Sequence, residues 1–332
     1  MFRSIARSAA LIAAMVAIAP AEALTTTPPE DELDVFIMAP ERLNGETQVA
    51  NGQKVFAADW PTLAMAVIGP ALGNEPPPTC TAAFVGPNVL LSAAHCLENG
   101  LGMPRALKVR FGPTTYDLRC DAPAAYKARD IQFSAPRGSE DFALCLLLDG
   151  GVTPVPLQTM RFEVVEIRNR LATQDAVMLT GYGCDIITIV NGSIRPNRAD
   201  GALRIGNARI ASSATGGGAD SQFVSIRSNL SYEPALCPGD SGGPLLSGVT
   251  VEAASGPRRI RGVNSKIRPL LAGTPVIQSF MADTGAGVFS AFATSWMSDI
   301  EKWRGLPANS GKASEPVICG VNRTAGRWPC RA

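Results

Sequence analysis

The chain has 332 residues, of which 46% are hydrophobic and 18% are charged, so it can bury a large core as one large β domain or two smaller ones. This composition excludes an intrinsically disordered chain. The 30 Lys and Arg side chains nearly balance the 29 Asp and Glu side chains, so the sequence lacks the basic footprint of a protein that binds nucleic acid or an anionic membrane. We therefore expect a partner that is neutral or locally recognised.

Residues 1–23 are typical of a signal peptide. Two arginines form a charged start, residues 8–19 form an apolar run, and residues 21–23 (Ala-Glu-Ala) form a cleavage site. About 12 apolar residues are too few for a membrane anchor, which needs ~20 helical residues. We therefore expect a secreted or periplasmic protein whose mature chain starts near Leu24.

Residues 24–48 begin with a stretch rich in Thr, Pro, Glu and Asp, which predicts a propeptide or flexible lead and not a packed element. From residue 49 the chain consists of short apolar runs broken by Gly, Pro and Asn. Such runs predict an all-β barrel or sandwich. The predicted strands cover residues 62–68, 82–85, 89–94, 107–111, 142–148, 176–180, 204–210, 223–226, 259–263 and 287–289.

One helix is predicted near the end of the chain. Apolar residues recur at steps of three and four over residues 290–303, and Gly305 and Pro307 close the segment. Residues 306–332 then form a polar tail in which Cys319 and Cys330 are close enough to close a local loop. We expect a stapled surface extension, with a docking or export element as the alternative.

Eight cysteines in an exported chain predict disulfides. The sequence contains no C-x-x-C pair and a single histidine, so it lacks a zinc motif and we expect no metal or other cofactor. Many pairings of eight cysteines are possible, and the cysteine count does not choose among them. Cys80 lies 16 residues before Cys96, and a disulfide between them would hold the loop that carries His95. By constraining the unfolded chain, it would stabilise the folded protein by about 3 kcal/mol.

The main candidate site is the stretch of residues 237–245, which reads Cys-Pro-Gly-Asp-Ser-Gly-Gly-Pro-Leu. Ser241 lies between glycines, on a turn too tight for side chains, so its hydroxyl is lifted clear of the backbone. The neighbouring N–H groups are free to point at a developing oxyanion. This is the setting of a nucleophile.

The single histidine decides between two hydrolase templates. The G-x-S-x-G elbow of the α/β-hydrolases requires the order serine, acid, histidine. His95 lies far upstream of Ser241, so that order would leave the serine without a base. The order histidine, acid, serine remains, and Asp141, at the mouth of an apolar run, is the natural acid.

Three blocks resemble the signatures of the trypsin-like (chymotrypsin-fold) serine proteases: residues 93–96 (Ala-Ala-His-Cys), 141–144 (Asp-Phe-Ala-Leu) and 239–244 (Gly-Asp-Ser-Gly-Gly-Pro). The separations of 46 and 100 residues between the three candidate side chains are also similar to those of the family. Lesser marks of the family are matched by residues 181–183 (Gly-Tyr-Gly), 262–265 (Gly-Val-Asn-Ser) and 287–289 (Gly-Val-Phe).

The resemblance covers roughly residues 49–304 and implies a fold. It implies two six-stranded antiparallel β-barrels, at about residues 49–155 and 160–290, followed by a terminal helix at about residues 290–304. The whole protease domain would cover residues 49–305.

The resemblance also implies a function, that of a serine endopeptidase acting on protein or peptide substrates, expected to be a monomer. Ser241 would attack the peptide carbonyl, His95 would transfer its proton, and Asp141 would hold the imidazole tautomer. The N–H groups of Gly239 and Ser241 would form the oxyanion hole. Two alternatives stay open: a non-catalytic binding module, although the Ser, the His and the glycines that decayed relatives lose are all present, and an esterase on the same triad.

Asp240 implies a zymogen. A buried, unpaired carboxylate is costly, and the family pairs this one with an α-amino group that cleavage releases. A cut after Gln48 would free Val49 to pair with Asp240, although Gln48 is not the basic residue usual before such a cut, so the activating protease stays open. A cut after Arg42 would place the new terminus six residues too far away.

The resemblance places five residues at the pocket for the residue before the scissile bond: Ala235, Leu236, Ser265, Ile267 and Gly287. Ala235 stands where trypsin-type enzymes carry Asp, so a filled apolar pocket would favour small or medium aliphatic residues. Asp283 could instead enter the pocket from an insertion at residues 268–286 and restore a basic preference. Ser265 is expected to bond Asp141.

The resemblance also bears on the remaining cysteines. Cys237 lacks its usual partner on the far wall of the pocket, and Cys184 is the best substitute. Cys120 and Cys145 would join neighbouring strands of the first barrel.

Overall fold

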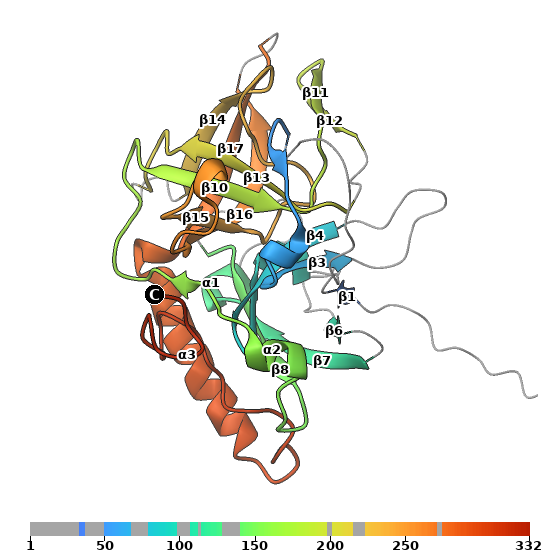
Figure 1. Ribbon diagram of the computed structural model, residues 1–332, viewed down its shortest axis with the longest axis vertical. Helices are drawn as coiled ribbons and strands as arrows, with labels where there is room; N and C mark the ends of the chain where they lie inside the picture. The colour runs from blue at the N-terminus through green and yellow to red at the C-terminus, as the bar shows by residue number, and fades with distance from the viewer. Residues whose placement is uncertain are drawn as a thin grey trace, which may run out of the picture. The chain divides into compact units, whose positions relative to one another are not determined.

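The computed structural model describes residues 33–36, 50–67, 79–97, 107–111, 114–127, 140–197, 201–214, 223–270 and 274–332. All of them belong to one compact unit that begins at Asp31. The expected signal peptide, Gln48 and Val49 lie outside the described residues. Figure 1 shows the two groups of strands and the long helix α3 (Val288–Arg304).

The first group of strands is a closed barrel with the order β1-β3-β4-β5-β8-β7-β6. Its strands are Leu33–Phe36 (β1), Leu63–Val67 (β3), Thr79–Gly86 (β4), Val89–Ser92 (β5), Leu107–Phe111 (β6), Thr114–Asp121 (β7) and Ala143–Leu148 (β8). All pairs are antiparallel except β1 with β6, which closes the barrel. The near-continuous apolar sequence of β8 suits a strand that is buried almost throughout.

The second group is a curled sheet with the order β14-β17-β16-β15-β10-β13-β2, to which β9 adds a short parallel pairing with β16. Its strands are Gln53–Lys54 (β2), Val164–Val165 (β9), Ala176–Gly181 (β10), Arg204–Arg209 (β13), Val224–Asn229 (β14), Pro244–Ser247 (β15), Arg259–Pro269 (β16) and Val276–Asp283 (β17). A separate hairpin joins Ile187–Val190 (β11) to Ser193–Pro196 (β12) through a turn at Asn191 and Gly192, which both have positive φ.

The predicted terminal helix is confirmed as α3. Its buried residues, Phe289, Ala293, Trp296 and Ile300, recur at steps of four and three and form one apolar face. Phe289 packs edge-on against Phe142, with ring centroids 5.1 Å apart. The other helical elements are short: Ala57–Asp59 (η1), Ala94–Leu97 (η2), Ala124–Lys127 (α1), Val155–Thr159 (α2), Val251–Ala253 (η3) and Thr284–Ala286 (η4).

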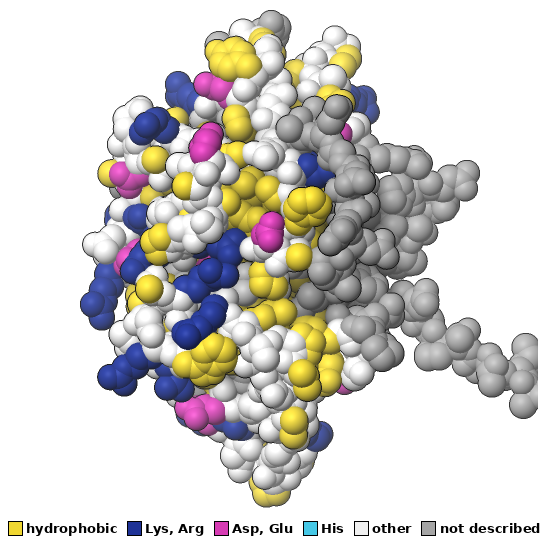
Figure 2. Space-filling view, viewed as in Figure 1, with side chains coloured by type: hydrophobic (Ala, Val, Ile, Leu, Met, Phe, Trp, Pro, Cys, Tyr) yellow, Lys and Arg dark blue, Asp and Glu magenta, His cyan; other side chains and the backbone are white. Residues whose placement is uncertain are grey.

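The surface carries charges of both signs. In Figure 2, basic and acidic side chains are interspersed with apolar ones over the face that is drawn, which agrees with the nearly balanced charge of the sequence. Within the described part of the chain, no helix combines the length and apolarity needed to cross a membrane.

The all-β, two-sheet prediction is confirmed, with two differences in detail. The described residues form seven strands in the first barrel and eight in the second sheet, where six each were expected. The extra barrel strand is β1, so the expectation that residues 24–48 contain no packed element is wrong for residues 33–36. Pairing with β1 satisfies edge groups of β3 and β6 that would otherwise face solvent.

The strand predicted at residues 287–289 is wrong. Gly287 has a φ of 86° and caps the N-terminus of α3, and Val288 and Phe289 are already helical. The strand that pairs with β16 is β17, which ends at Asp283. The described part of residues 268–286 therefore consists mainly of the end of β16 and the strand β17, which pair with each other.

The C-terminal tail is part of the core and not only a surface extension. The Cys319 N–H donates to Val85 of β4, while the Cys319 carbonyl accepts from the N–H of Val165 in β9, both at 2.8 Å. The Asn88 side chain pairs with the tail through Ser314, Glu315 and Val317. The tail thus forms hydrogen bonds to both sheets and connects them.

A buried charge network reinforces this contact. The Glu163 carboxylate lies 3.1 Å from Arg258 Nε, on the second sheet, and 3.4 Å from Arg331 Nε, on the tail. The Thr62 hydroxyl, next to β3, donates to the same carboxylate at 2.6 Å. Four segments that are distant in sequence therefore meet at one buried carboxyl group.

Removal of the tail disulfide tests this structural role. The double variant Cys319→Ala with Cys330→Ala should lose about 3 kcal/mol of unfolding free energy, because the bridge closes a loop of about 12 residues in the unfolded chain. Urea unfolding measures the loss. An unchanged midpoint would contradict the role of the tail as a structural fastener.

Candidate active site

The lone histidine and the expected acid meet at the edge of the first barrel. His95 lies on η2, directly after β5, and the disulfide between Cys80 and Cys96 ties this turn to β4. His95 Nδ1 lies 2.8 Å from Asp141 Oδ2, and the His95 N–H donates to Asp141 Oδ1 at 3.0 Å. Asp141 therefore holds both the imidazole and its backbone.

Asp141 is ionised in this setting. Burial by itself raises the pKa of this fully enclosed carboxyl, but the interaction with His95 and the hydrogen bonds from His95 and Ser265 outweigh burial and hold the pKa below its usual range. The Ser265 hydroxyl donates to Asp141 Oδ2 at 2.5 Å, which is the hydrogen bond that the resemblance implies. The His95 side chain is 26% exposed, whereas Asp141 is fully buried.

Ser241 lies opposite this pair, on the turn before β15. Its Oγ donates to the carbonyl oxygen of Ser265 at 3.3 Å, so Ser265 contacts both the acid and the candidate nucleophile. The Cys96 sulfur lies 3.9 Å from His95 Nε2 and 3.8 Å from the Ser241 carbonyl oxygen. His95 and Asp141 are thus in direct contact, and Ser241 is linked to this pair through contacts that it shares with Ser265 and Cys96.

Glycines let the Ser241 turn pack this closely. A Cβ at Gly242, where φ is 82°, would come within 2.2 Å of Ser92 Oγ and of the Thr81 carbonyl oxygen. A Cβ at Gly181 or Gly183 would overlap the Asp240 carboxylate. The Gly-Tyr-Gly and Ser-Gly-Gly strings therefore reflect close approach of backbones.

The backbone before Ser241 is oriented by hydrogen bonds. The Cys184 N–H donates to the Pro238 carbonyl oxygen at 3.1 Å. Because a trans peptide group points its N–H away from its C=O, the Gly239 N–H points away from Cys184. Gly239 itself has a φ of 103°, which favours glycine.

Asp240 is fully buried behind the turn. Its Oδ1 accepts from the Gly183 N–H and its Oδ2 from the Cys237 N–H, both at 2.8 Å. Burial raises the pKa of Asp240 to about 7, although these hydrogen bonds and the charge of Arg204 act in the opposite direction. The expected partner Val49 lies outside the described residues, but its neighbour Ala50 forms a β-bridge with Ala235.

Three of the five expected pocket residues adjoin one another. Ala235 and Leu236 are buried in neighbouring apolar clusters, and Ile267 packs against both clusters. Ser265 lies two residues before Ile267 on β16. Gly287, by contrast, lies at the exposed start of α3 and is no part of this wall.

Ser279, and not Gly287, is the residue that lies beside Ile267 and Leu236. It lies on β17, pairs with Ile267 in the sheet, and its Oγ accepts the Leu236 N–H at 3.1 Å. The apolar run of residues 276–282 could have indicated this strand, but the Gly-Val-Phe string resembled the family more closely. Asp283 is buried at the far end of β17, where its Oδ1 accepts the Gly285 N–H, so the structure does not place it in the pocket.

The four disulfides join Cys80 to Cys96, Cys120 to Cys145, Cys184 to Cys237 and Cys319 to Cys330, which confirms the four expected pairs. Among the described residues, one group of potential metal ligands lies within 4.8 Å: Cys80, His95 and Cys96. Both sulfurs are oxidised in a disulfide and cannot bind a metal as thiolates.

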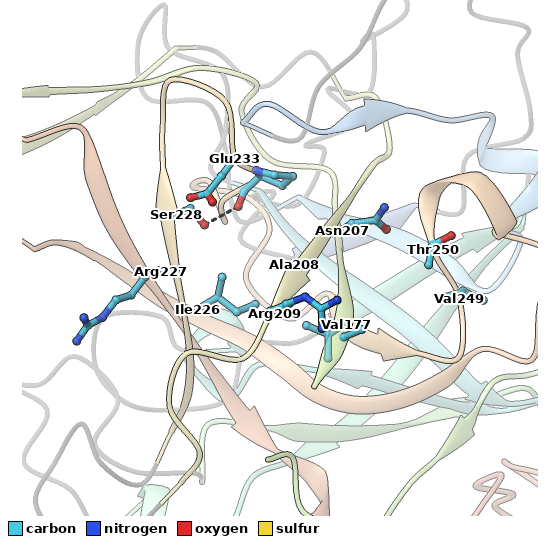
Figure 3. A pocket seen from close by; sticks show the side chains of 12 residues that line it. Val177, Asn207, Ala208, Arg209, Ile226, Arg227, Ser228, Glu233, Val249 and Thr250 are labelled. Carbon is cyan, nitrogen blue, oxygen red and sulfur yellow. Dashed lines mark hydrogen bonds between the residues drawn. The ribbon is translucent and has the colours of Figure 1, made fainter. Parts of the chain in front are cut away.

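A separate pocket of about 380 Å³ opens on the second sheet (Figure 3). Strands β10, β13 and β14 line it, together with residues 233–234 and 249–250. None of its lining residues is an expected site residue. Two of the polar side chains that line it bond to backbone carbonyls: Arg209 donates to the Gln174 carbonyl oxygen and Ser228 to that of Pro234.

Comparison with known proteins assigns this geometry to a family. The family model named Trypsin matches residues 49–269, well over half of the chain. The chain belongs to the trypsin family. No curated protein matches this trypsin-family chain.

Solved structures resemble the trypsin-family chain at low identity. A thermostable serine protease, AL20, from an extremophilic microorganism has 17% identity and a TM-score of 0.48, over 72% of this chain and 98% of that one. A mutant of human heparin binding protein has 15% identity and a TM-score of 0.48, over 75% and 96%. A Glu endopeptidase in complex with MPD has 12% identity and a TM-score of 0.44, over 74% and 96%.

The raised pKa of Asp240 predicts a pH-dependent stability. The carboxyl group is neutral in the folded and the unfolded chain below pH about 4, and in the folded chain it ionises only near pH 7. Its contribution to the free energy of unfolding is therefore present at low pH and is lost as the pH rises from about 4 to 7. The melting temperature of the uncut chain should therefore fall, relative to that of Asp240→Asn, over this range. A constant difference between pH 4 and pH 8 would contradict the assignment.

Proposed function

We propose that the chain is a secreted or periplasmic serine endopeptidase. The observation that carries the proposal is the position of Ser265, which hydrogen-bonds the carboxylate that orients His95 and also accepts from the hydroxyl of Ser241. A binding module would not need an ionised Asp141 behind a half-buried imidazole. Four disulfides fit an oxidising compartment.

The proposed mechanism is acyl transfer. Ser241 rotates from the Ser265 carbonyl toward the imidazole and attacks the peptide carbonyl, while His95 takes the hydroxyl proton and then donates it to the leaving amine. Asp141 remains ionised throughout, since its pKa is low, and it fixes the Nδ1–H tautomer and stabilises the imidazolium. Water then hydrolyses the acyl-enzyme by the same route.

The oxyanion would be held by the N–H groups of Gly239 and Ser241. The proposal is supported by the hydrogen bond from Cys184 to the Pro238 carbonyl, which turns the Gly239 N–H away from the hairpin. Preorganised donors of this kind are worth on the order of 3 kcal/mol each in related hydrolases.

Activation by cleavage after Gln48 is part of the proposal. Ala50 forms a β-bridge with Ala235, which lies five residues before Asp240. This bridge supports the proposal that Val49, the residue before Ala50, can reach the Asp240 carboxylate after cleavage. A new α-amino group there would pair with a carboxylate that burial makes unfavourable to ionise. The positive charge of Arg204 already lowers the pKa of Asp240 in part, and the α-amino group would act in the same direction.

The proposed substrates are proteins or peptides with a small or medium aliphatic residue before the scissile bond. Ala235 would leave the pocket floor uncharged, and Ile267 and Ser279 lie side by side on β16 and β17. The Asp283 carboxylate accepts the Gly285 N–H, which argues against the alternative basic preference.

Labelling with a fluorophosphonate tests the proposed function. Cleaved wild-type protein should be labelled and should hydrolyse peptides, whereas Ser241→Ala should lose both properties, with hydrolysis reduced on the order of 10⁵-fold or more. A binding module would stay unlabelled, and an esterase would be labelled but would turn over esters without peptides.

Widening the pocket tests the proposed preference. In a peptide library, Ile267→Gly should shift the preferred residue from small aliphatic side chains toward aromatic ones, by about 10-fold or more in relative kcat/KM. Gly287→Asn is the matched control, because Asn tolerates positive φ and the site is remote from the wall. A preference of the wild type for Lys or Arg would refute the aliphatic assignment.

A further inference from the structure

The hydroxyl of Thr81 is buried at the junction of the two sheets. Thr81 lies on β4, next to Cys80, and its side chain is fully enclosed. Its Oγ1 donates to the Gly239 carbonyl oxygen at 2.9 Å and accepts from the Tyr182 N–H at 3.0 Å. The hydroxyl thus donates one hydrogen bond and accepts another, and the two partners belong to different segments of the second half of the chain.

The backbone of Thr81 makes a second contact with the same turn. Its N–H donates to the Ser241 carbonyl oxygen at 2.7 Å. Any residue at this position could make that bond, whereas the bond to Gly239 requires a hydroxyl. The β-branched side chain restricts χ1, so the hydroxyl is held in place at little entropic cost.

These bonds bear on the orientation of Gly239. A glycine is free to adopt many backbone conformations, so its own sequence does not fix the direction of the flanking peptide groups. The Pro238 carbonyl is held by Cys184 and the Gly239 carbonyl by Thr81, one on each side of the Gly239 Cα. Together they fix φ and ψ at the residue whose N–H would face the oxyanion.

We propose that Thr81 is a positioning residue that orients the Gly239 N–H for the oxyanion. The inference rests on the proposed function, since it takes Ser241 as the nucleophile. Without the hydroxyl, the Gly239 carbonyl and the Tyr182 N–H lose their common partner, and the glycine peptide relaxes toward other conformations. The rate of acyl transfer falls, while binding of the substrate is preserved.

The test compares Thr81→Val, which keeps the shape, with Thr81→Ser, which keeps the hydroxyl. In cleaved protein, Thr81→Val should lower kcat by about 10- to 100-fold with KM nearly unchanged, since loss of a full oxyanion donor costs 10²- to 10³-fold. Thr81→Ser should recover kcat to within about threefold of the wild type. The rate of fluorophosphonate labelling should follow kcat.

Thr284→Val is the matched control. The Thr284 hydroxyl is also fully buried and donates to a carbonyl oxygen, that of Glu166, at 2.8 Å, but it lies at the far end of β17. This variant should lose thermal stability without losing kcat. An equal fall of kcat in Thr284→Val, or a normal kcat in Thr81→Val, overturns the proposal.

If Thr81→Val does not fold, Thr81→Ala deletes the hydroxyl without adding bulk, and failure of both variants to fold overturns the proposal in favour of a structural role. If the wild type is neither labelled nor active, the proposed function is wrong, and the proposed role of Thr81 is wrong with it. If the wild type is active and the Thr81 variants match it, only the role of Thr81 fails.

Discussion

The buried carboxylate of Asp240 is the constraint on which the site depends. It accepts hydrogen bonds from the N–H groups of Gly183 and Cys237, which lie on the two segments that the Cys184–Cys237 disulfide joins. These bonds fix the turn that leads to Ser241. A carboxylate can be buried only where such donors are aimed at it. The glycines around it follow from this, since a side chain there would occupy the space of its oxygens.

The two sheets contribute different parts of the site. The first barrel provides the imidazole and the carboxylate that orients it, and the second provides the candidate nucleophile. Ser265, on β16, is the residue that connects them, through its hydroxyl to Asp141 and its carbonyl to Ser241. A small shift between the sheets would break these hydrogen bonds, so the position of one sheet on the other is itself a requirement for the site.

The C-terminal tail and the Glu163 network meet that requirement from another part of the molecule. The tail bonds to β4 and β9, and Glu163 joins Arg258 of the second sheet to Arg331 of the tail. Removing one partner of such a buried network leaves an uncompensated charge, which is costly. The tail, which has no catalytic group of its own, therefore stabilises the arrangement of the two sheets.

The sequence by itself determined the elements whose signals are local. Short apolar runs located most strands, the period of three to four residues located α3, and three short strings singled out His95, Asp141 and Ser241 as candidate site residues. It also determined that Ser241 has only one possible histidine partner. Most strand predictions and the helix prediction were confirmed because each depends on residue type and spacing within a short stretch.

Only the tertiary structure decided which residue pairs with Ile267 and which strand closes the barrel. Ser279, and not Gly287, faces Ile267, because the register of β16 and β17 is set by packing across the whole sheet. Residues 33–36 pair with β3 and β6 because two strand edges need partners, which no short motif encodes. The contact of the Thr81 hydroxyl with Gly239 spans 158 residues and exists only where two sheets meet.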